Sequence, residues 1–253
     1  MFKALLRRAA RSCGYEIRKV QPSPAGRDWI VDLGRLLPTS PAPVLFDVGA
    51  NVGVVSQRLA GAFPAPARIF AFEPAAATFT QLVAALSGHP HVQCQHLALS
   101  EKPGRFRLYH GINSQLNRLA PVGTLGDNTH EDVEVSTVDD VAGRLGLARI
   151  DVLKIDTEGF EVEVLRGAAG LLQCSAIRAI VAEATFDLAS DRHTRFDEIR
   201  ALLVPRGFYL HGIYDCELWG EHLKFANVLF LHEAAFPPPP AMISPATSGP
   251  ARA

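Results

Sequence analysis

The feature that most constrains the fold is a regular alternation between short apolar runs and longer segments of helical periodicity. Five runs suit strands buried on both faces: Val44–Val48, Arg68–Phe72, Val92–Leu97, Ile150–Ile155 and Ile177–Ala182. Helical patterns follow four of them, at about 53–62, 75–87, 160–172 and 191–204. This alternation is typical of a parallel sheet with helices on both faces. We therefore predict a doubly wound, mostly parallel α/β sheet, closed by strands at Phe208–His211 and Ala226–His232, one of them antiparallel.

The alternating pattern defines one main domain, residues 44–236, between two segments of different character. Residues 1–20 carry six basic side chains against one acid and have the spacing of an amphipathic helix. This helix either docks on its own domain or contacts a membrane surface or a partner. Residues 21–43 contain five prolines and predict a connector with a short helix near Trp29–Leu37. Residues 237–253 are rich in Pro and Ala and predict a disordered tail.

Segment 105–136 interrupts the alternation inside the main domain. Phe106–Tyr109 and Val133–Ser136 alternate like exposed strands, and a polar stretch rich in Gly and Asn separates them. Long excursions of this kind are often binding loops. Asn113, Ser114 and Gln115 could hydrogen-bond a polyhydroxylated acceptor.

Composition excludes several classes of protein. A formal net charge of −1 gives no global reason to expect a nucleic-acid partner. No apolar run approaches the ~20 residues that span a bilayer, and arginines interrupt any signal-peptide core at the N-terminus. The four cysteines form no C-x-x-C pair, which argues against a zinc site or a disulfide scaffold. A cytoplasmic protein with no transmembrane segment is the expectation.

The turn after the first strand is the most informative motif. The strand runs into Asp47, and Gly49, Ala50, Asn51 and Gly53 follow before a helix begins. Glycines allow a tight turn and close approach of backbone to a ligand at the carboxyl edge of the sheet. A dinucleotide site would require G-x-G-x-x-G, whose third glycine is missing here. Asp47 would also repel a phosphate, whereas it could accept from an α-ammonium group. The turn therefore favours a ligand with an amino-acid end.

Two further strand ends complete the predicted ligand site. Glu73 follows the second strand, 26 residues after Asp47, where a carboxylate can bind both hydroxyls of a ribose. The alternative is that Glu73 only stabilises the N-terminus of the next helix. After the third strand, Ala98, Leu99 and Ser100 would lie against an adenine edge, although an ordinary loop explains them nearly as well.

Several blocks together resemble the FkbM family of methyltransferases, over about Val44 to Glu183. These blocks are Asp47-Val-Gly-Ala-Asn-Val-Gly53, Ala71-Phe-Glu-Pro74, Ala98-Leu-Ser100, Val135-Ser-Thr-Val-Asp-Asp140, Leu153-Lys-Ile-Asp-Thr-Glu-Gly-Phe-Glu161 and Leu165-Arg-Gly-Ala168. The resemblance implies a Rossmann-like class I methyltransferase fold, S-adenosyl-L-methionine as methyl donor, and transfer to a hydroxyl of a sugar, glycolipid or secondary metabolite. It implies cofactor contacts at Asp47, Gly49, Asn51, Gly53, Glu73 and 98–100, and reaction-side acids at Asp156 and Glu158. Thr157 stands where the family frequently has Val.

The end of the fourth strand predicts the reaction chemistry. Lys154, Asp156 and Glu158 carry charges at the carboxyl end of an apolar strand, where charge is costly unless it is paired or hydrated. Asp156 or Glu158 could remove the proton of an acceptor hydroxyl. Lys154 could pair with either acid or with a carboxylate of a neighbouring strand. Glu161 is interpreted as a helix N-terminal acid.

In the main hypothesis for this site, no residue binds a metal. A second version places a divalent cation between Asp156, Glu158 and perhaps Glu183. Histidines such as His193 are rival bases, but a lone histidine is more often structural.

Three other functions stay open alongside an O-methyltransferase. The first is methylation of a nitrogen or carbon acceptor, although Thr-Glu-Gly after Asp156 differs from the Asn/Asp-Pro-Pro-aromatic segment frequent in N-methyltransferases. The second is a non-catalytic binding protein of the same fold, against which the full set of Asp47, Glu73 and Asp156 argues. The third is an NAD-dependent oxidoreductase, disfavoured by Asp47 and the missing glycine.

Overall fold

The computed structural model describes residues 25–37, 41–109, 118–121, 130–187 and 193–238. The basic helix predicted at 1–20, the polar triplet at 113–115, and all but the first two residues of the predicted tail lie outside these ranges. Within the described part of the chain, no helix combines the length and apolar character that crossing a bilayer requires.

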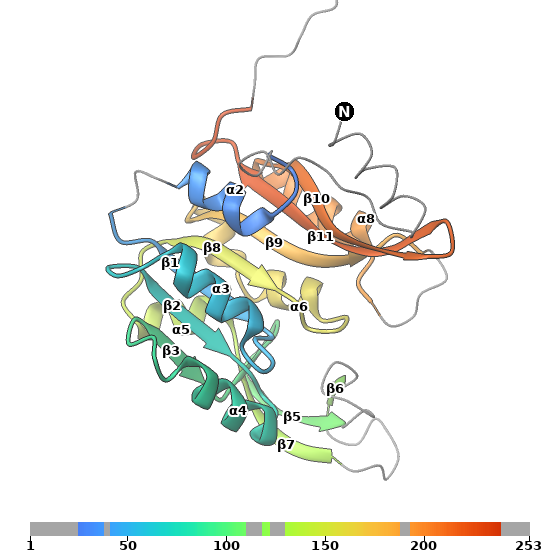
Figure 1. Ribbon diagram of the computed structural model, residues 1–253. Helices are drawn as coiled ribbons and strands as arrows, with labels where there is room; N and C mark the ends of the chain where they lie inside the picture. The colour runs from blue at the N-terminus through green and yellow to red at the C-terminus, as the bar shows by residue number, and fades with distance from the viewer. Residues whose placement is uncertain (1–24, 38–40, 110–117, 122–129, 188–192, 239–253) are drawn as a thin grey trace, which may run out of the picture.

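A seven-stranded sheet forms the centre of the molecule (Figure 1). Its strands, in spatial order, are β10 (Phe208–Trp219), β11 (His222–His232), β9 (Ile177–Thr185), β8 (Ile150–Ile155), β1 (Val44–Val48), β2 (Arg68–Phe72) and β3 (Val92–Gln95). β11 runs antiparallel to both of its neighbours, and the other pairings are parallel. The prediction of a doubly wound, mostly parallel sheet with an antiparallel closing strand is confirmed.

The direction of strand addition reverses between β1 and β8. From β1 the chain builds outward to β2 and β3, and it then returns to the other side of β1 with β8 and β9. In open α/β sheets, ligands bind beyond the carboxyl ends of the strands at such a switch point. The residues that follow β1, β2 and β8 therefore occupy the position where a ligand is expected.

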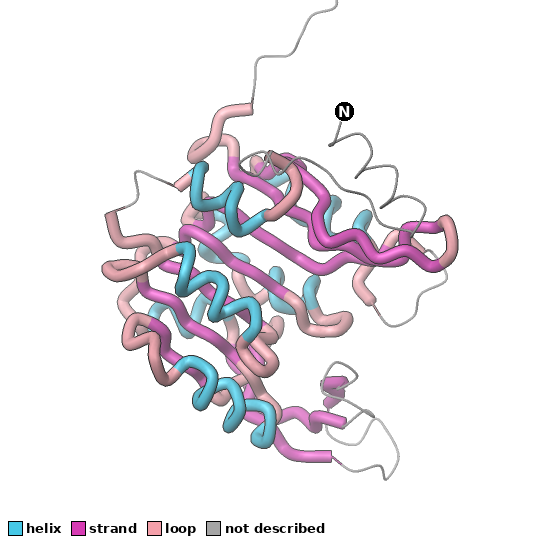
Figure 2. Tube along the Cα trace, in the orientation of Figure 1, coloured by secondary structure: helices cyan, strands magenta, loops and turns pink. Residues whose placement is uncertain are grey.

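Helices cover both faces of this sheet (Figures 1 and 2). On one face lie α2 (Trp29–Leu36), α3 (Val54–Ala62) and α4 (Ala76–Leu86), where Leu33 and Leu59 pack on Leu45 and Ile69. On the other lie α5 (Val138–Arg144), α6 (Glu161–Arg166), α7 (Ala169–Gln173) and α8 (Phe196–Leu203), the last followed by a 3-10 turn, Val204–Arg206. Successive strand residues point to opposite faces, so Leu45 and Phe46 enter different halves of the core.

The connector segment contributes to the core through α2. Asp28 caps this helix by accepting from the backbone N–H groups of Ile30 and Val31, and Trp29 is buried in the same cluster as Leu33. The buried Asp32 carboxylate accepts a hydrogen bond of 3.0 Å from the Tyr214 hydroxyl of β10. This bond joins α2 to the closing β10–β11 hairpin.

A second, four-stranded sheet is built from the excursion. Its order is β4 (Ala98–Leu99), β7 (His130–Ser136), β5 (Gly104–Tyr109) and β6 (Arg118–Pro121). The strands predicted at Phe106–Tyr109 and Val133–Ser136 correspond to β5 and β7. The third strand was predicted to run to Leu97, but β3 ends at Gln95 because the chain leaves the main sheet to pair β4 with β7.

Other elements also differ from the sequence prediction: β9 was predicted to end at Ala182 and runs to Thr185. The helix predicted at 160–172 is two helices, α6 and α7, which meet where Gly167 packs on the Ser100 carbonyl; a Cβ there would lie 2.1 Å from that oxygen. The α5 helix, capped by Thr137, was not predicted. The β10–β11 hairpin is longer than expected and extends beyond the carboxyl edge of the sheet (Figure 1).

Candidate active site

The turn after β1 is held against the neighbouring strands by its backbone. The N–H groups of Gly49 and Ala50 both donate to the Phe72 carbonyl, at 3.1 and 2.9 Å. Gly49 has a φ of +79°, and a Cβ at this position would lie 1.8 Å from the Asp156 carbonyl oxygen of the β8 edge. Gly53, with a φ of +93°, precedes the first residue of α3. Glycine is therefore required where the turn approaches the end of β8.

Glu73 lies at the end of β2, with only 7% of its surface exposed. Its Oε2 accepts from the Asn51 N–H at 3.0 Å, and its Oε1 accepts from the Ala75 N–H at 2.9 Å. Burial raises the pKa of Glu73, and these two backbone bonds oppose the rise. Ala75 is the N-cap residue of α4, so Glu73 does contact the start of the next helix, as one of the two sequence interpretations expected. Glu73 also binds the Asn51 N–H of the first turn, which a role at the helix N-terminus alone does not explain.

A buried lysine joins the first turn to the end of β8. Lys154 Nζ lies 3.0 Å from Asp47 Oδ1 and 3.5 Å from Asp156 Oδ2, and it donates to the Gly49 carbonyl at 3.3 Å. Burial alone would lower the pKa of Lys154, but the two carboxylates outweigh it and raise the pKa above its usual value. Lys154 thus pairs both with an acid of its own segment and with the carboxylate of a neighbouring strand, the two partners that the sequence suggested.

Asp47 has no exposed surface in the structure. Its Oδ2 accepts from the Ser56 hydroxyl at 2.5 Å, and its Oδ1 faces Lys154. The carboxylate therefore serves to position the lysine and the first turn. A direct contact with an α-ammonium group stays a prediction from the sequence.

The loop after β8 is organised by Glu161, a residue that the sequence assigned to the helix N-terminus. Glu161 is the first residue of α6 and is buried, but its Oε1 accepts from the loop: from the Thr157 N–H at 2.8 Å, the Thr157 hydroxyl at 3.0 Å and the Gly159 N–H at 3.3 Å. Burial raises the pKa of Glu161, opposed by the Thr194 hydroxyl and the Thr157 N–H. Glu161 thus fixes the loop from which Glu158 projects, with a φ of +55°.

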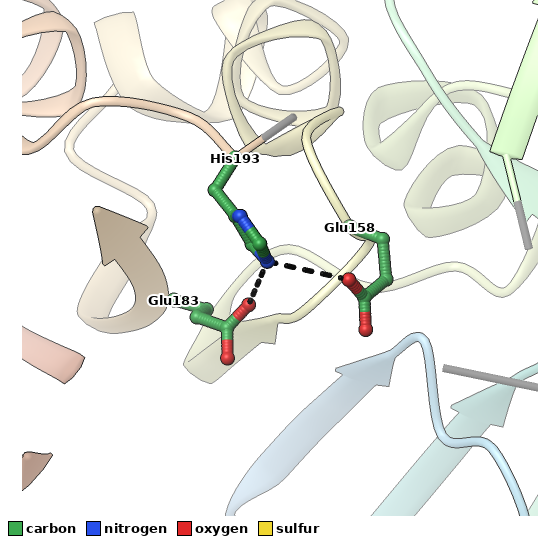
Figure 3. A group of neighbouring side chains, drawn as sticks. All are labelled: Glu158, Glu183 and His193. Atoms are coloured by element: carbon green, nitrogen blue, oxygen red, sulfur yellow. Dashed lines mark ion pairs between the residues drawn. The ribbon is translucent and has the colours of Figure 1, made fainter. Parts of the chain in front are cut away.

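Glu158 meets two residues from the β9 side of the sheet. His193 Nε2 lies 3.5 Å from Glu158 Oε2 and 4.0 Å from Glu183 Oε2 (Figure 3). Burial, with the charges of Asp156, Glu158 and Glu161, raises the pKa of Glu183 to about 9. The sequence suggested Glu183 as a companion of Asp156 and Glu158, whereas nothing in it singled out His193 among the nine histidines.

Ala98, Leu99 and Ser100 are buried in the second sheet. Ser100 donates its N–H to the Ser136 carbonyl at 2.9 Å. Ala98 belongs to the same apolar cluster as Ala75, two residues after Glu73, and the ring of Phe160 packs against that cluster. The segment is therefore part of the wall next to Glu73, and an adenine contact there stays a prediction.

The predicted residues of the first, second and fourth strand ends come together at one edge. Asn51 binds Glu73, Gly49 binds Lys154, and Lys154 binds Asp156. Lys154 is also close enough to Glu73 to lower its pKa. A charged chain of contacts therefore runs along the carboxyl edge, from the acid after β2 to the acid after β8.

The sequence is similar to a known protein family and to known methyltransferases. The profile of the methyltransferase FkbM domain matches residues 47–210. Methyltransferase sdnD of Sordaria araneosa is 32% identical over 200 residues, which cover 66% of this chain and 73% of that protein. Methyltransferase 1 of Beauveria bassiana (strain ARSEF 2860) is 32% identical over 145 residues, covering 49% of this chain and 57% of that protein.

One solved structure that is similar is the methyltransferase FkbM from Methylobacillus flagellatus KT. It aligns with a TM-score of 0.49 at 14% identity, over 76% of this chain and 44% of that one. The chain spans little more than half the length of the Beauveria relative and less than half of the solved protein. The profile match covers the first turn, the acid after β2 and the acids after β8. This chain belongs to the FkbM methyltransferase domain family.

Proposed function

We propose that this chain is an S-adenosyl-L-methionine-dependent methyltransferase that methylates a hydroxyl group of a sugar, a glycan or glycolipid, or a secondary metabolite. The observation that carries the proposal is the single charged edge described above, on which contacts link Glu73 and the glycine turn, through Lys154, to Asp156. Membership of the family supports methyl transfer, and the residues of the edge support the division of roles.

The residues present fit the proposed cofactor. A carboxylate offers about four lone-pair sites, and Glu73 uses one on each oxygen for a backbone N–H. The remaining sites suit the two hydroxyls of a ribose. At Gly49 a side chain would collide with the β8 edge, so the turn keeps its backbone close to the strand ends. Ala75 and Ala98 form an apolar wall against which Phe160 packs, as an adenine ring requires.

Methyl transfer requires an acceptor oxygen in line with the methyl carbon and a base for the acceptor's proton. When bound, S-adenosylmethionine supplies an electrophilic methyl group on a sulfonium. As the oxygen–carbon bond forms, the electron pair of the breaking carbon–sulfur bond goes to sulfur. Asp156, with about a third of its side chain exposed, accepts the hydroxyl proton. Lys154 orients the Asp156 carboxylate from the buried side.

The acids after β8 favour an oxygen acceptor over a nitrogen acceptor. An alcohol has a pKa far above neutrality, so its attack benefits from a carboxylate nearby. Asp156, Glu158 and Glu183 place three carboxylates at this end of the sheet, and Glu183 feels the charges of the other two. A divalent cation is an alternative means of activating the same hydroxyl.

Cofactor binding tests the first half of the proposal. Calorimetry on the wild-type chain is expected to show saturable binding of S-adenosylmethionine and none of NAD. Glu73→Ala should abolish or strongly weaken this binding. Glu101→Ala, a substitution at a half-exposed carboxylate in the turn before β5, is the matched control and should bind as the wild type does. Binding of NAD without S-adenosylmethionine would overturn the assignment.

Turnover tests the second half. The wild-type chain is incubated with S-adenosylmethionine and a panel of sugar and polyketide alcohols, and mass spectrometry detects products that have gained one methyl group. Asp156→Asn should retain cofactor binding and lose roughly 10²–10⁴-fold in turnover. Turnover at the wild-type rate would remove Asp156 from the mechanism. An acceptor methylated on nitrogen or carbon instead of oxygen would contradict the proposed reaction.

A further inference from the structure

Three side chains from separate segments converge beside the proposed reaction site. Glu158 projects from the loop after β8, Glu183 from the last part of β9, and His193 from the segment that precedes α8. One ligand atom of each, a carboxylate oxygen or an imidazole nitrogen, lies within 4.8 Å of the other two. Figure 3 shows the two carboxylates and the imidazole turned toward one common point.

The spacing of these atoms differs from that of a hydrogen-bonded pair. His193 Nε2 is 3.5 Å from Glu158 Oε2 and 4.0 Å from Glu183 Oε2, beyond the ~2.7–2.9 Å of charge-assisted hydrogen bonds. Ligands that each lie about 2.0–2.2 Å from one metal ion are separated from each other by about 3–4 Å. His193 Nε2 therefore lies from each carboxylate oxygen at the separation of two ligands of one cation, and all three atoms lie within 4.8 Å of one another.

The site has a surplus of negative charge. Glu183 is largely buried, and Asp156, Glu158 and Glu161 all act on it by repulsion. The buried Lys154 already faces Asp47 and Asp156, so its charge is shared between two acids. A cation at the common point would offset the repulsion.

The imidazole is held in place by its neighbours. The His193 ring stacks on Phe225 of β11, with ring centroids 5.4 Å apart and an interplanar angle of 21°. Glu183 lies on β9 opposite Asn227 of β11. Two of the three ligands are thus positioned by adjacent strands, and the third by the loop that Glu161 fixes. Pre-positioned ligands of this kind favour metal binding.

We propose that Glu158, Glu183 and His193 bind a divalent first-row transition-metal cation such as Mn²⁺. One imidazole nitrogen and two carboxylate oxygens suit such ions better than Mg²⁺ or Ca²⁺, which prefer oxygen ligands only. The inference rests on the proposed function for its role: the cation would polarise an acceptor hydroxyl and ease its deprotonation, and Asp156 would receive the proton. The ligand set differs from the one expected from the sequence, because His193 replaces Asp156.

The test is a calorimetric titration of the full chain, freed of metals by a chelator, with MnCl₂. One saturable site per chain is expected. His193→Gln and Glu183→Gln should each weaken Mn²⁺ binding at least roughly tenfold. Glu163→Gln is the matched control, since this acid lies on α6 near an exposed arginine, and its affinity should equal that of the wild type. Addition of CoCl₂ should give visible absorption bands that change in His193→Gln, which reports the nitrogen ligand directly.

Circular dichroism establishes whether each variant is folded. If His193→Gln does not fold, the Mn²⁺ affinity of Glu183→Gln tests the metal site. No saturable binding by the wild type at millimolar MnCl₂, or equal affinity in all variants, overturns the metal site. S-adenosylmethionine is titrated into the same samples without metal. Absence of cofactor binding by the wild type would overturn the proposed function. Cofactor binding and turnover that Mn²⁺ does not change would overturn the role of the cation in the reaction and leave the proposed function standing.

Discussion

Gly49→Ala should be among the most damaging single-methyl substitutions in this chain. The φ of +79° costs an alanine about 1–2 kcal/mol. The added Cβ would lie 1.8 Å from the Asp156 carbonyl oxygen, so the turn or the β8 edge must move by at least 1.2 Å to reach the 3.0 Å limit of real Cβ contacts (3.0 − 1.8). That movement strains the bond from the Asp156 N–H to the Val48 carbonyl and the contact of Lys154 with Gly49.

Each of these hydrogen bonds contributes about 1 kcal/mol, and the bond from the charged lysine contributes more. The total cost is about 3–5 kcal/mol, which lowers the Tm of a chain of this size by roughly 6–20 °C. Urea denaturation, followed by the fluorescence of the buried Trp29, measures the free energy of unfolding.

Gly61→Ala is the control for this prediction. Gly61 lies in α3, and a Cβ there meets nothing within 4 Å. Alanine is the better helix former, so this variant should be equal to the wild type or up to ~1 kcal/mol more stable. If Gly49→Ala unfolds within ~0.5 kcal/mol of Gly61→Ala, the close contact between the first turn and β8 does not exist as described.

Three further substitutions test the charged edge and the closing hairpin. Lys154→Met leaves two carboxylates without their buried cation and should destabilise the fold by about 3–5 kcal/mol in urea; a loss below ~1 kcal/mol would contradict the ion pairs. Tyr214→Phe removes the donor to the buried Asp32 and should cost about 1–3 kcal/mol in the same assay, and an unchanged midpoint would show that this bond contributes nothing. In the proposed complex, ribose hydroxyls would donate to the ionised form of Glu73, whose pKa is raised by burial, so calorimetric affinity for S-adenosylmethionine should fall as the pH is lowered through that pKa. Glu73→Gln should remove this pH dependence along with most of the affinity, and an equal slope in both proteins would refute the contact.

The buried strands were the elements most accurately predicted. Val44–Val48, Arg68–Phe72 and Ile150–Ile155 match the structure residue for residue, because each is almost entirely buried. The hairpin strands were predicted too short, since most of β10 is exposed and its register shifts between Leu210 and Gly212. A half-exposed, irregular strand leaves a weak alternation in the sequence.

Long-range packing explains the other differences. The break between α6 and α7 depends on Gly167 touching the Ser100 carbonyl, a contact between residues far apart in the chain. Periodicity in the sequence carries no trace of such a contact.

The sequence predicted the site residues that directly follow the buried strands. It did not predict the contacts made by Glu161 and His193, which depend on how other segments fold. Lys154 lies at the end of a buried apolar strand, and Asp156 and Glu158 follow it directly. Charged residues at such a place are easily recognised in the sequence. Glu161 was assigned to a helix terminus because the sequence does not show which way a side chain turns. His193 joins the site because the next two residues, Thr194 and Arg195, pair with Thr185 at the end of β9. A single histidine in a polar stretch has no distinguishing pattern in the sequence.

The position of Lys154 couples the turn after β1 to the acid after β8. One ammonium group contacts both the turn that would receive the methyl donor and the acid that would receive the acceptor's proton. Any ligand that draws this charge toward one half weakens its hold on the other, so occupancy of the two halves is energetically linked. Thermodynamic reciprocity then requires that the donor alter acceptor affinity by the same factor as the acceptor alters donor affinity. The affinity of the site for each substrate in the presence of the other would then depend in part on the charge of Lys154.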